Sequence, residues 1–408
     1  MARVLIIAYT TYGHDGRVKR QAEALSRRGD LVEVICLAPE PAADADGVTI
    51  LGIPLPRYRG PSRAGYLRSY LSFFLRAGTT ALRRSLKAPY DLVIVCTMPD
   101  EAILSALPCR LFGSRTILDI HDTMPELYMD KFDGRRARLG ARILMAGERL
   151  SARLADCVLA VHDLHAQRLR QAGIPEHKIV VVTNGPDPRI FKPMAPDAAA
   201  NQDADAGAPA SFTVVCHGTV TRRLGLDTAL HAMALLHRRL PDVRLRIIGA
   251  GDYLGEIKSL CRRLDLRAAV TFEDPVPIHR LPDLLRTAAA GLVPNHATRA
   301  TQLMLPVKLL EFATLGVPVI AARLRTIQHY FGDGAVRYFT PGDGADLARA
   351  IEELYHHPRR RAALAKLAAL EVSELSWERQ SRRYYEAVDW LLNKSQGAAW
   401  CRKKARPW

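Results

Sequence analysis

The sequence predicts an α/β protein built from two doubly wound parallel sheets. The chain has 408 residues, which is long enough for two domains with full-sized cores. Continuous aliphatic segments alternate with helical segments, and such strands are typical of parallel sheets buried on both faces. The alternation stops once, at the acidic, low-complexity segment PDAAANQDADAGAPA, and then restarts. Two successive α/β units imply two Rossmann-like domains that face each other.

The elements of the first half follow in order. RVLIIAY is the first expected strand, and DGRVKRQAEALSRRGD is a helix for which Gly29 is a plausible C-cap. The further strands of this half are VEVICLA, DLVIVCT, RTILDIH, CVLAVH and IVVVTNG.

The second half repeats the pattern. Its expected strands are FTVVCHG, RLRIIGAG, AVTFEDP, AGLVP and VPVIAA. Helices are expected at LDTALHAMALLHRRLP, LGEIKSLCRRLD and PIHRLPDLLRTA, and within LPVKLLEFATLGVPVIA.

These elements define the expected domain boundaries. The first domain spans residues 1–193, a linker or surface excursion spans 194–210, and the second domain spans 211–375. A last helix at 376–395 crosses back to the first domain, and residues 396–408 form a basic tail.

Composition restricts the class of protein. The mean hydropathy of −0.05 is that of an ordinary globular chain, and no apolar run is long enough to span a membrane. RVLIIAY is too short for the core of a signal peptide, so a cytoplasmic protein is expected. The seven cysteines are scattered, which indicates reduced core thiols rather than a disulfide framework or a zinc site.

The net charge of +16 favours anionic partners, and its distribution is informative. No acidic residue occurs between Gly47 and Tyr90, and this stretch includes the amphipathic segment YLRSYLSFFLRAG. One hypothesis is that residues 57–87 contact an anionic membrane surface, which would bring the protein to a lipid-linked acceptor. The alternative is a solvated basic helix with its aromatic residues in the core. Nucleic acid is not expected as a partner, because the stretch contains no known reader motif.

Ligands of open α/β sheets bind outside the carboxyl ends of the strands. The segments that follow the expected strands are polar, rich in glycine, or both, although loops are polar in most proteins. They are YTTYGHDGR, HDTMPE and NGPDPRIF in the first half, and HGTVTRR, GAGDY, EDPVP and VPNHATRATQLMLPVK in the second.

Lys308 and Glu311 are out of place in LPVKLLEFATLGVPVIA, an otherwise apolar helix and strand. With Pro306 as the first helical residue and Gly316 as the C-cap, Lys308 lies in the first turn. The helix dipole disfavours a cation there by ~0.3–1 kcal/mol, and a bound anion would reverse the sign. Glu311 lies on the same face and could accept hydrogen bonds from two adjacent hydroxyls. The alternative is an ordinary Lys–Glu pair.

Two other strand-end segments contain candidate side chains. Arg222 and Arg223 precede a helix, where guanidinium groups and free N–H groups suit a phosphate. Solvated surface arginines are the alternative. His121 follows a strand of the first half and should face the ligand; Asp119 and Asp122 would either orient it or cap the next helix. A structural histidine is again the alternative.

The ordered motifs resemble retaining glycosyltransferases of the GT-B fold, in the group called family 4 or group 1. The resemblance covers nearly the whole chain. It is carried by HGTVTRRLGLDTALHAM, RLRIIGAGDY, VTFEDPVPIHRLPDLL and LPVKLLEFATLGVPVI, and in the first half by DGRVKRQAEALSRRGDLVEVICL, ILDIHDTMPE and VVVTNGPDPRIF.

The resemblance implies that the second domain binds a nucleotide-diphosphate sugar and that the first receives a saccharide or lipid-linked acceptor. It implies that Glu311 binds ribose, and that Arg222, Arg223 and Lys308 contact the diphosphate. His121 would lie near the transferred sugar, and no metal or cofactor is expected. The remaining donor-binding positions that it implies are Gly13, Gly16, Gly218, Asp252, Pro277, Met304, Leu305 and Val307.

The sequence departs from the family pattern at two places. Many relatives carry two glutamates eight positions apart, and the first would fall at Leu303, so hexose recognition must differ. Leu224 stands where a basic residue is expected before Gly225, which leaves Arg223 to serve. Two other functions stay open: a nucleotide-sugar 2-epimerase of the same architecture, and a non-catalytic module that binds sugar nucleotides.

Overall fold

The computed structural model describes residues 1–37, 42–58, 60, 62–132, 134–193 and 212–392. The expected linker and basic tail therefore lie outside the described residues. The chain forms two compact units. Unit 1 comprises Met1–Asn184 and the C-terminal helix from Glu378 onward, and unit 2 comprises Gly185–Trp377.

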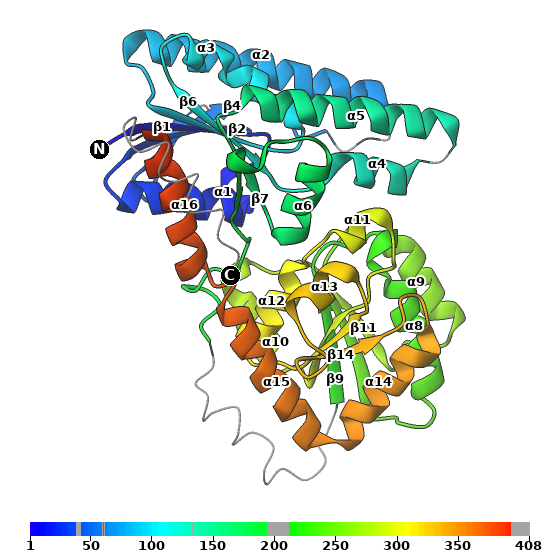
Figure 1. Ribbon diagram of the computed structural model, residues 1–408. Helices are drawn as coiled ribbons and strands as arrows, with labels where there is room; N and C mark the ends of the chain where they lie inside the picture. Colours follow the sequence, from blue (N-terminus) through cyan, green and yellow to red (C-terminus); the bar gives the residue numbers. More distant parts are fainter. Residues whose placement is uncertain (38–41, 59, 61, 133, 194–211, 393–408) are drawn as a thin grey trace. The chain divides into compact units, whose positions relative to one another are not determined.

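Unit 1 is built on one sheet with the strand order β3-β4-β2-β1-β5-β6-β7-β8 (Figure 1). All neighbouring strands are parallel except β3 and β4, which pair antiparallel. The strands are β1 (Arg3–Ala8), β2 (Leu31–Leu37), β3 (Ala42–Ala45), β4 (Val48–Ile53), β5 (Leu92–Cys96), β6 (Arg115–Ile120), β7 (Cys157–Ala160) and β8 (Ile179–Val181).

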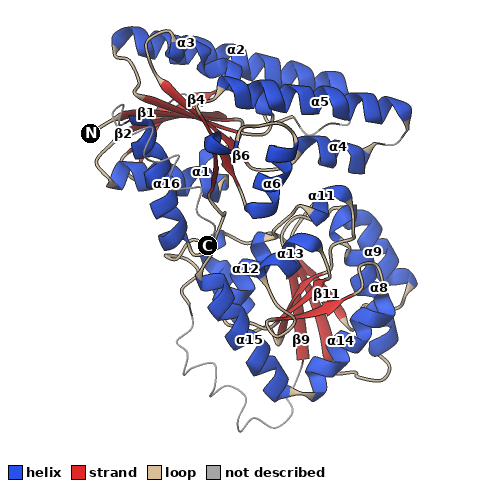
Figure 2. Cartoon of the chain, viewed as in Figure 1, coloured by secondary structure: helices blue, strands red, loops and turns tan. Residues whose placement is uncertain are grey.

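Helices cover both faces of this sheet (Figure 2). They are α1 (Gly16–Arg27), α2 (Arg63–Lys87), α3 (Leu107–Arg110), α4 (Met124–Lys131), α5 (Arg135–Leu154), α6 (Asp163–Gln171) and α16 (Trp377–Leu392), with 3-10 helices η1 (Tyr12–His14), η2 (Asp100–Ala106) and η3 (Glu176–Lys178). Leu5 and Ile7 of β1 belong to one core cluster with buried residues of α2, η2 and α5. Successive strand side chains point to opposite faces, so the equally buried Val4 and Ile6 face the other layer.

Unit 2 has an all-parallel sheet with the order β11-β10-β9-β12-β13-β14. Its strands are β9 (Phe212–His217), β10 (Val243–Ile248), β11 (Val270–Glu273), β12 (Ala290–Val293), β13 (Val319–Ala322) and β14 (Val336–Phe339). Its helices are η4 (Arg222–Leu224), α8 (Leu226–Leu236), α9 (Leu254–Arg263), η5 (Ile278–Arg280), α10 (Leu281–Arg286), α11 (Arg299–Gln302), α12 (Val307–Thr314), α13 (Arg325–Tyr330), α14 (Gly344–His356) and α15 (Pro358–Ser373).

The predicted fold class, two doubly wound parallel sheets, is confirmed. Three strands were not predicted: β3 and its neighbour β4 in unit 1, and the edge strand β14 in unit 2. The helix expected from Pro306 is one residue shorter at each end, since α12 runs over Val307–Thr314 with Pro306 as N-cap and Leu315 as C-cap. Among the described residues, no helix is both long and apolar enough to cross a membrane.

Candidate functional site

The strand order of each sheet reverses at one point, and open α/β sheets bind ligands there. In unit 1 the chain winds outward in both directions from the neighbouring strands β1 and β5. In unit 2 the corresponding neighbours are β9 and β12. The loops at the carboxyl ends of these strands therefore mark one candidate site in each unit.

Backbone contacts hold the strand-end loops of unit 2 together. The Gly218 N–H donates to the Ile248 carbonyl, and the Tyr253 N–H donates to the Val220 carbonyl at 3.2 Å. A Cβ at Gly249 would lie 1.9 Å from the Gly218 carbonyl oxygen, so only glycine permits this approach. The loops after β9 and β10 thus form one surface beside β9.

Lys308 and Glu311 reach this surface from α12. Lys308 is half-buried in the first turn, with its Nζ 3.9 Å from the Cys216 Sγ. Glu311 is 7% exposed, and its Oε2 lies 3.2 Å from the Nε2 of His217, the last residue of β9. One helical turn therefore places an ammonium and a carboxylate beside the carboxyl end of the central strand.

His217 is neutral at this site. Burial and the positive charge of Lys308 lower the pKa of His217 to about 3. Lys308 is consequently the cation next to Glu311, and the first-turn N–H groups of α12 add a favourable field for an anion.

The two arginines differ in their surroundings. Arg222 is exposed, its Nη2 donates to the Glu256 Oε2 at 2.7 Å, and its guanidinium lies 4.6 Å from the Tyr253 ring centroid. Arg223 is half-buried, and its Nε is buried without a hydrogen-bond partner among the described residues. Arg222 thus fits the surface interpretation, whereas Arg223 has an unused buried donor.

The structure adds a pair that the sequence did not indicate, His296 and Asp227. The His296 Nε2 lies 2.8 Å from the Asp227 Oδ1, and both side chains are partly exposed. The hydrogen bond to Asp227 raises the pKa of His296 against the effect of burial. The pKa of Asp227 is lowered, because the hydrogen bond and charge of His296 outweigh burial. The backbone N–H of His296 donates to the Arg223 carbonyl, which joins this pair to the loop that contains Arg222 and Arg223.

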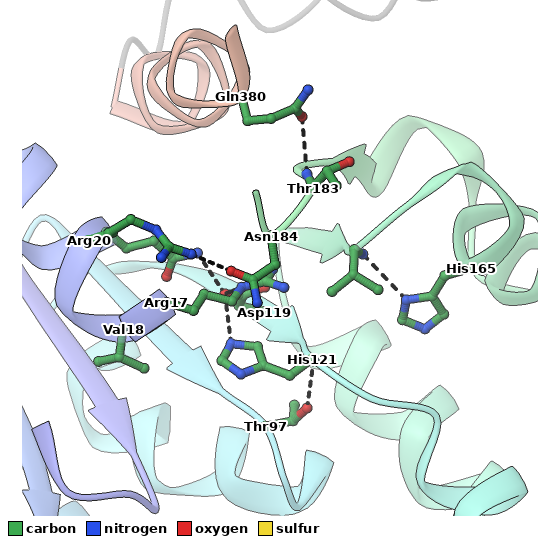
Figure 3. A network of polar contacts seen from close by, with 12 residues as sticks. Arg17, Val18, Arg20, Thr97, Asp119, His121, His165, Thr183, Asn184 and Gln380 are labelled. Carbon is green, nitrogen blue, oxygen red and sulfur yellow. Dashed lines mark hydrogen bonds and ion pairs between the residues drawn. The ribbon is translucent and has the colours of Figure 1, made fainter. Parts of the chain in front are cut away.

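In unit 1 the candidate site centres on Asp119, the penultimate residue of β6, which is fully buried (Figure 3). Arg17 forms an ion pair with both oxygens of Asp119, and the Gln21 Nε2 donates to its Oδ2 at 2.8 Å. Burial opposes ionisation, but the charge of Arg17 and the contacts with His121 and Gln21 prevail and lower the pKa of Asp119.

Asp119 in turn holds His121. The His121 Nε2 lies 3.0 Å from the Asp119 Oδ2, and the His121 N–H donates to the Thr97 Oγ1. With Nε2 directed at the carboxylate, Nδ1 is the ring nitrogen left for a ligand. Donor atoms of Cys96, Asp119 and His121 lie within 4.8 Å of one another. A cation fits poorly there, because Arg17 already neutralises the carboxylate and burial raises the pKa of the Cys96 thiol well above its usual range.

The other predicted positions are distributed over both units. Gly13 lies in η1 and Gly16 begins α1, so both belong to unit 1, whereas the remaining donor-binding candidates belong to unit 2. Gly218 directly follows β9. A Cβ placed on this glycine would lie 3.9 Å from the Lys308 Nζ, so Gly218 lies beside Lys308. Asp252 and Pro277 are exposed in the loops after β10 and β11. Met304 and Leu305 are half-buried between α11 and α12, Val307 begins α12, and Leu303 is the C-cap of α11.

Two doubly wound α/β sheets with polar strand-end loops are the architecture of the GT-B class, and solved glycosyltransferases share this fold. Residues 13–185 match the model of the glycosyl transferase 4-like domain, and residues 211–357 match that of the glycosyl transferases group 1. The chain belongs to the group 1 glycosyltransferases, as its motifs predict.

Relatives agree with this assignment. The chain is 30% identical over 214 residues to a GDP-mannose-dependent α-(1-6)-phosphatidylinositol monomannoside mannosyltransferase of Mycolicibacterium smegmatis, covering 52% of this chain and 56% of the relative. It is 28% identical over 227 residues to a D-inositol 3-phosphate glycosyltransferase of Arthrobacter, covering 53% of this chain and 52% of the relative. The chain thus spans about half the length of the curated relatives it matches.

Solved structures share the fold. Anabaena HepE in complex with UDP and glucose superimposes with a TM-score of 0.69 at 18% identity, covering 95% of this chain and 100% of that one. WaaG, a glycosyltransferase involved in lipopolysaccharide biosynthesis, gives a TM-score of 0.69 at 17% identity, covering 96% of this chain and 100% of that one.

Proposed function

We propose that the protein transfers a sugar from a nucleotide-diphosphate sugar to a hydroxyl of a saccharide or lipid-linked acceptor, with retention of anomeric configuration. The observation that carries the proposal is the placement of Lys308 and Glu311 on one turn of α12, beside the carboxyl end of β9. A buried carboxylate next to a fixed cation provides separate partners for sugar hydroxyls and for phosphate.

Each group of unit 2 has a role in this proposal. The Glu311 carboxylate accepts hydrogen bonds from the two ribose hydroxyls. Lys308, Arg223 and the backbone from Met304 to Val307 stabilise the diphosphate, and Arg222 adds charge from the surface. Asp252 and the turn at Pro277 contact the nucleoside.

In unit 1, His121 and the loop containing Gly13 and Gly16 serve the transferred sugar and the acceptor. The acceptor oxygen bonds to the anomeric carbon on the face from which the diphosphate leaves, and the hydroxyl proton passes to the departing phosphate oxygen. Fixed cations stabilise the charge on the leaving group, so the proposed reaction uses no metal.

The names of the relatives favour transfer over the two other functions. The two curated relatives are glycosyltransferases, and two solved structures of Anabaena HepE contain UDP with glucose or UDP-glucose. A 2-epimerase needs no acceptor, and a binding module turns over no donor, so product analysis separates the three functions.

The test is incubation with a panel of UDP- and GDP-sugars, with and without saccharide and lipid acceptors. Transfer that requires an acceptor, with a product of unchanged anomeric configuration by NMR, is expected. Acceptor-independent release of a rearranged sugar would establish the epimerase instead, and donor binding without turnover would establish the module.

The variant Glu311→Gln tests the ribose contact. Charge-assisted hydrogen bonds contribute ~1.5–3 kcal/mol, so donor affinity measured by calorimetry should fall about 10- to 100-fold. Glu374→Gln, an exposed carboxylate of the same unit, is the matched control and should bind donor normally. Equal affinity of both variants would remove Glu311 from the donor site.

We also propose that residues 57–87 contact an anionic membrane surface, which would supply a lipid-linked acceptor. The support is the acid-free, arginine-rich sequence of this segment, most of which forms α2.

A further inference from the structure

Helix α2 exposes a row of leucines instead of burying it. Phe73, Ala77 and Ala81 face the core of unit 1. Five leucines of α2 are 36–72% exposed and recur at spacings of four and seven residues: Leu67, Leu71, Leu75, Leu82 and Leu86. These spacings place the leucines on one face of the helix, away from the sheet.

Helix α5 repeats this arrangement. Ala137, Ala141 and Ala152 are buried. Leu139, Ile143 and Leu150 are 55–64% exposed and occupy one face at spacings of four and seven residues. Isolated exposed leucines are common, but two aligned rows form an apolar surface that calls for an explanation.

The two helices belong to one layer of unit 1 (Figure 1). Element η2 packs against both α2 and α5, and buried residues of all three elements share one core cluster. Leu104 of η2 is itself 44% exposed. The outer faces of α2, η2 and α5 therefore form one surface, which we call the α2–α5 face.

The exposed charges of α2 and α5 have one sign. Exposed Arg68, Arg76, Arg83 and Lys87 follow the leucine row of α2, and exposed Arg138, Arg142, Arg149 and Arg153 lie along α5. The only acidic residue within either helix is Glu148, which is fully buried and paired with Arg168. Element η2 adds the buried Asp100 and the half-buried Glu101. The eight exposed cations of α2 and α5 outnumber these acids, so the α2–α5 face has a net positive charge.

We infer that the α2–α5 face is a docking surface for an anionic lipid bilayer, in which α5 contributes as much as α2. This inference rests on the proposed membrane contact of residues 57–87 and extends it to a second helix. Leucine rows enter the acyl boundary while arginines extend to the headgroup phosphates. A second copy of the chain fits poorly, because pairing two such faces would bring arginine rows together.

The test is co-sedimentation of the full chain with phosphatidylcholine vesicles that contain or lack phosphatidylglycerol. Binding is expected only with phosphatidylglycerol and should weaken at high salt. The triple variant Leu139→Gln, Ile143→Gln, Leu150→Gln should lower the vesicle partition coefficient at least tenfold, as should Leu67→Gln, Leu71→Gln, Leu75→Gln. Glutamine keeps helix propensity, so both variants should retain their circular dichroism.

Leu367→Gln with Leu370→Gln, on the exposed side of α15 in unit 2, is the matched control and should bind vesicles normally. Loss of binding in the α2 variant alone would overturn the role of α5 while leaving the membrane contact of residues 57–87 in place. Normal binding in both variants would overturn the α2–α5 face altogether. So would a dimer in size-exclusion chromatography that both variants dissociate. Donor affinity, measured on the same proteins, reports on the glycosyl transfer proposal separately.

Discussion

The buried His217 makes the stability of unit 2 depend on pH, and the charge of Lys308 contributes to this dependence. His217 is 7% exposed, and burial together with Lys308 lowers its pKa to about 3. An unfolded chain restores an ordinary histidine pKa of about 6.5, so the unfolded state binds the proton more tightly. Stability contributed by neutral His217 is fully present above pH 6.5 and is lost as the pH falls toward 3.

We therefore expect His217→Gln to reduce the acid sensitivity of unit 2. At pH 5 the wild type should have lost roughly 2 kcal/mol from this group alone, because each pKa unit corresponds to about 1.4 kcal/mol. Urea unfolding of both proteins at pH 7 and pH 5 measures the difference. An equal loss of unfolding free energy in both proteins would show that His217 titrates normally in the folded state.

The candidate residues were only partly predictable from the sequence. Lys308 and Glu311 stood out because a charged pair within an apolar helix is visible in local sequence. Their neighbour His217 and the pair of Asp227 with His296 depend on contacts between distant segments. A single sequence contains no signal for such contacts, which the crossovers of the sheet bring about.

At the scale of elements, continuous aliphatic runs predicted the central strands well, because those strands are buried on both faces. The strands at or next to a sheet edge, β3, β4 and β14, were missed for physical reasons. Along β4 only the first and last residues are fully buried, and β3 is a short run of alanines and one aspartate. Strand β14 has only four residues and includes Arg337, so none of the three has the continuous apolar signal of a central strand. The amphipathic pattern of α2 was visible, but the sequence could not tell which of its apolar faces points outward.

The end of α12 allows a test of element stability. Gly316 follows the helix with a φ of +70°, a conformation that costs an L-residue about 1 kcal/mol. We expect Gly316→Ala to lower the free energy of unfolding by roughly that amount.

At Gly255, in the same unit, substitution by alanine should instead increase stability. Gly255 lies in the first turn of α9, and no neighbouring atom lies within 4 Å of the Cβ that alanine would add. Gly255→Ala should therefore raise stability by about 0.5–1 kcal/mol. Thermal unfolding of the two variants decides the matter. A rise in the unfolding temperature of both variants would mean that helix propensity, rather than the left-handed conformation, determines the effect at Gly316. A fall in both would contradict the gain expected at Gly255.

At the scale of the whole molecule, the chain completes unit 1 only after it has built unit 2. Helix α16 returns to unit 1, where the Gln380 Oε1 accepts a hydrogen bond from the buried Thr183 N–H at 3.0 Å (Figure 3). The Tyr385 hydroxyl donates to the Ala24 carbonyl of α1, and Arg28 pairs with Asp389. The stability of unit 1 should therefore depend on residues that follow unit 2 in sequence.

Gln380→Ala should consequently weaken unit 1 and leave unit 2 unchanged. The substitution leaves a buried N–H without its acceptor, which costs about 1–3 kcal/mol. Hydrogen exchange followed by mass spectrometry should show faster exchange in β8, α1 and α16, with the strands of unit 2 unaffected. Asp389→Asn is the control and should change little, because its partner Arg28 also pairs with Asp30 and exposed ion pairs contribute at most about 1 kcal/mol. Faster exchange throughout both units would instead show that they unfold as one cooperative body, and the division of stability would not follow the division of the fold.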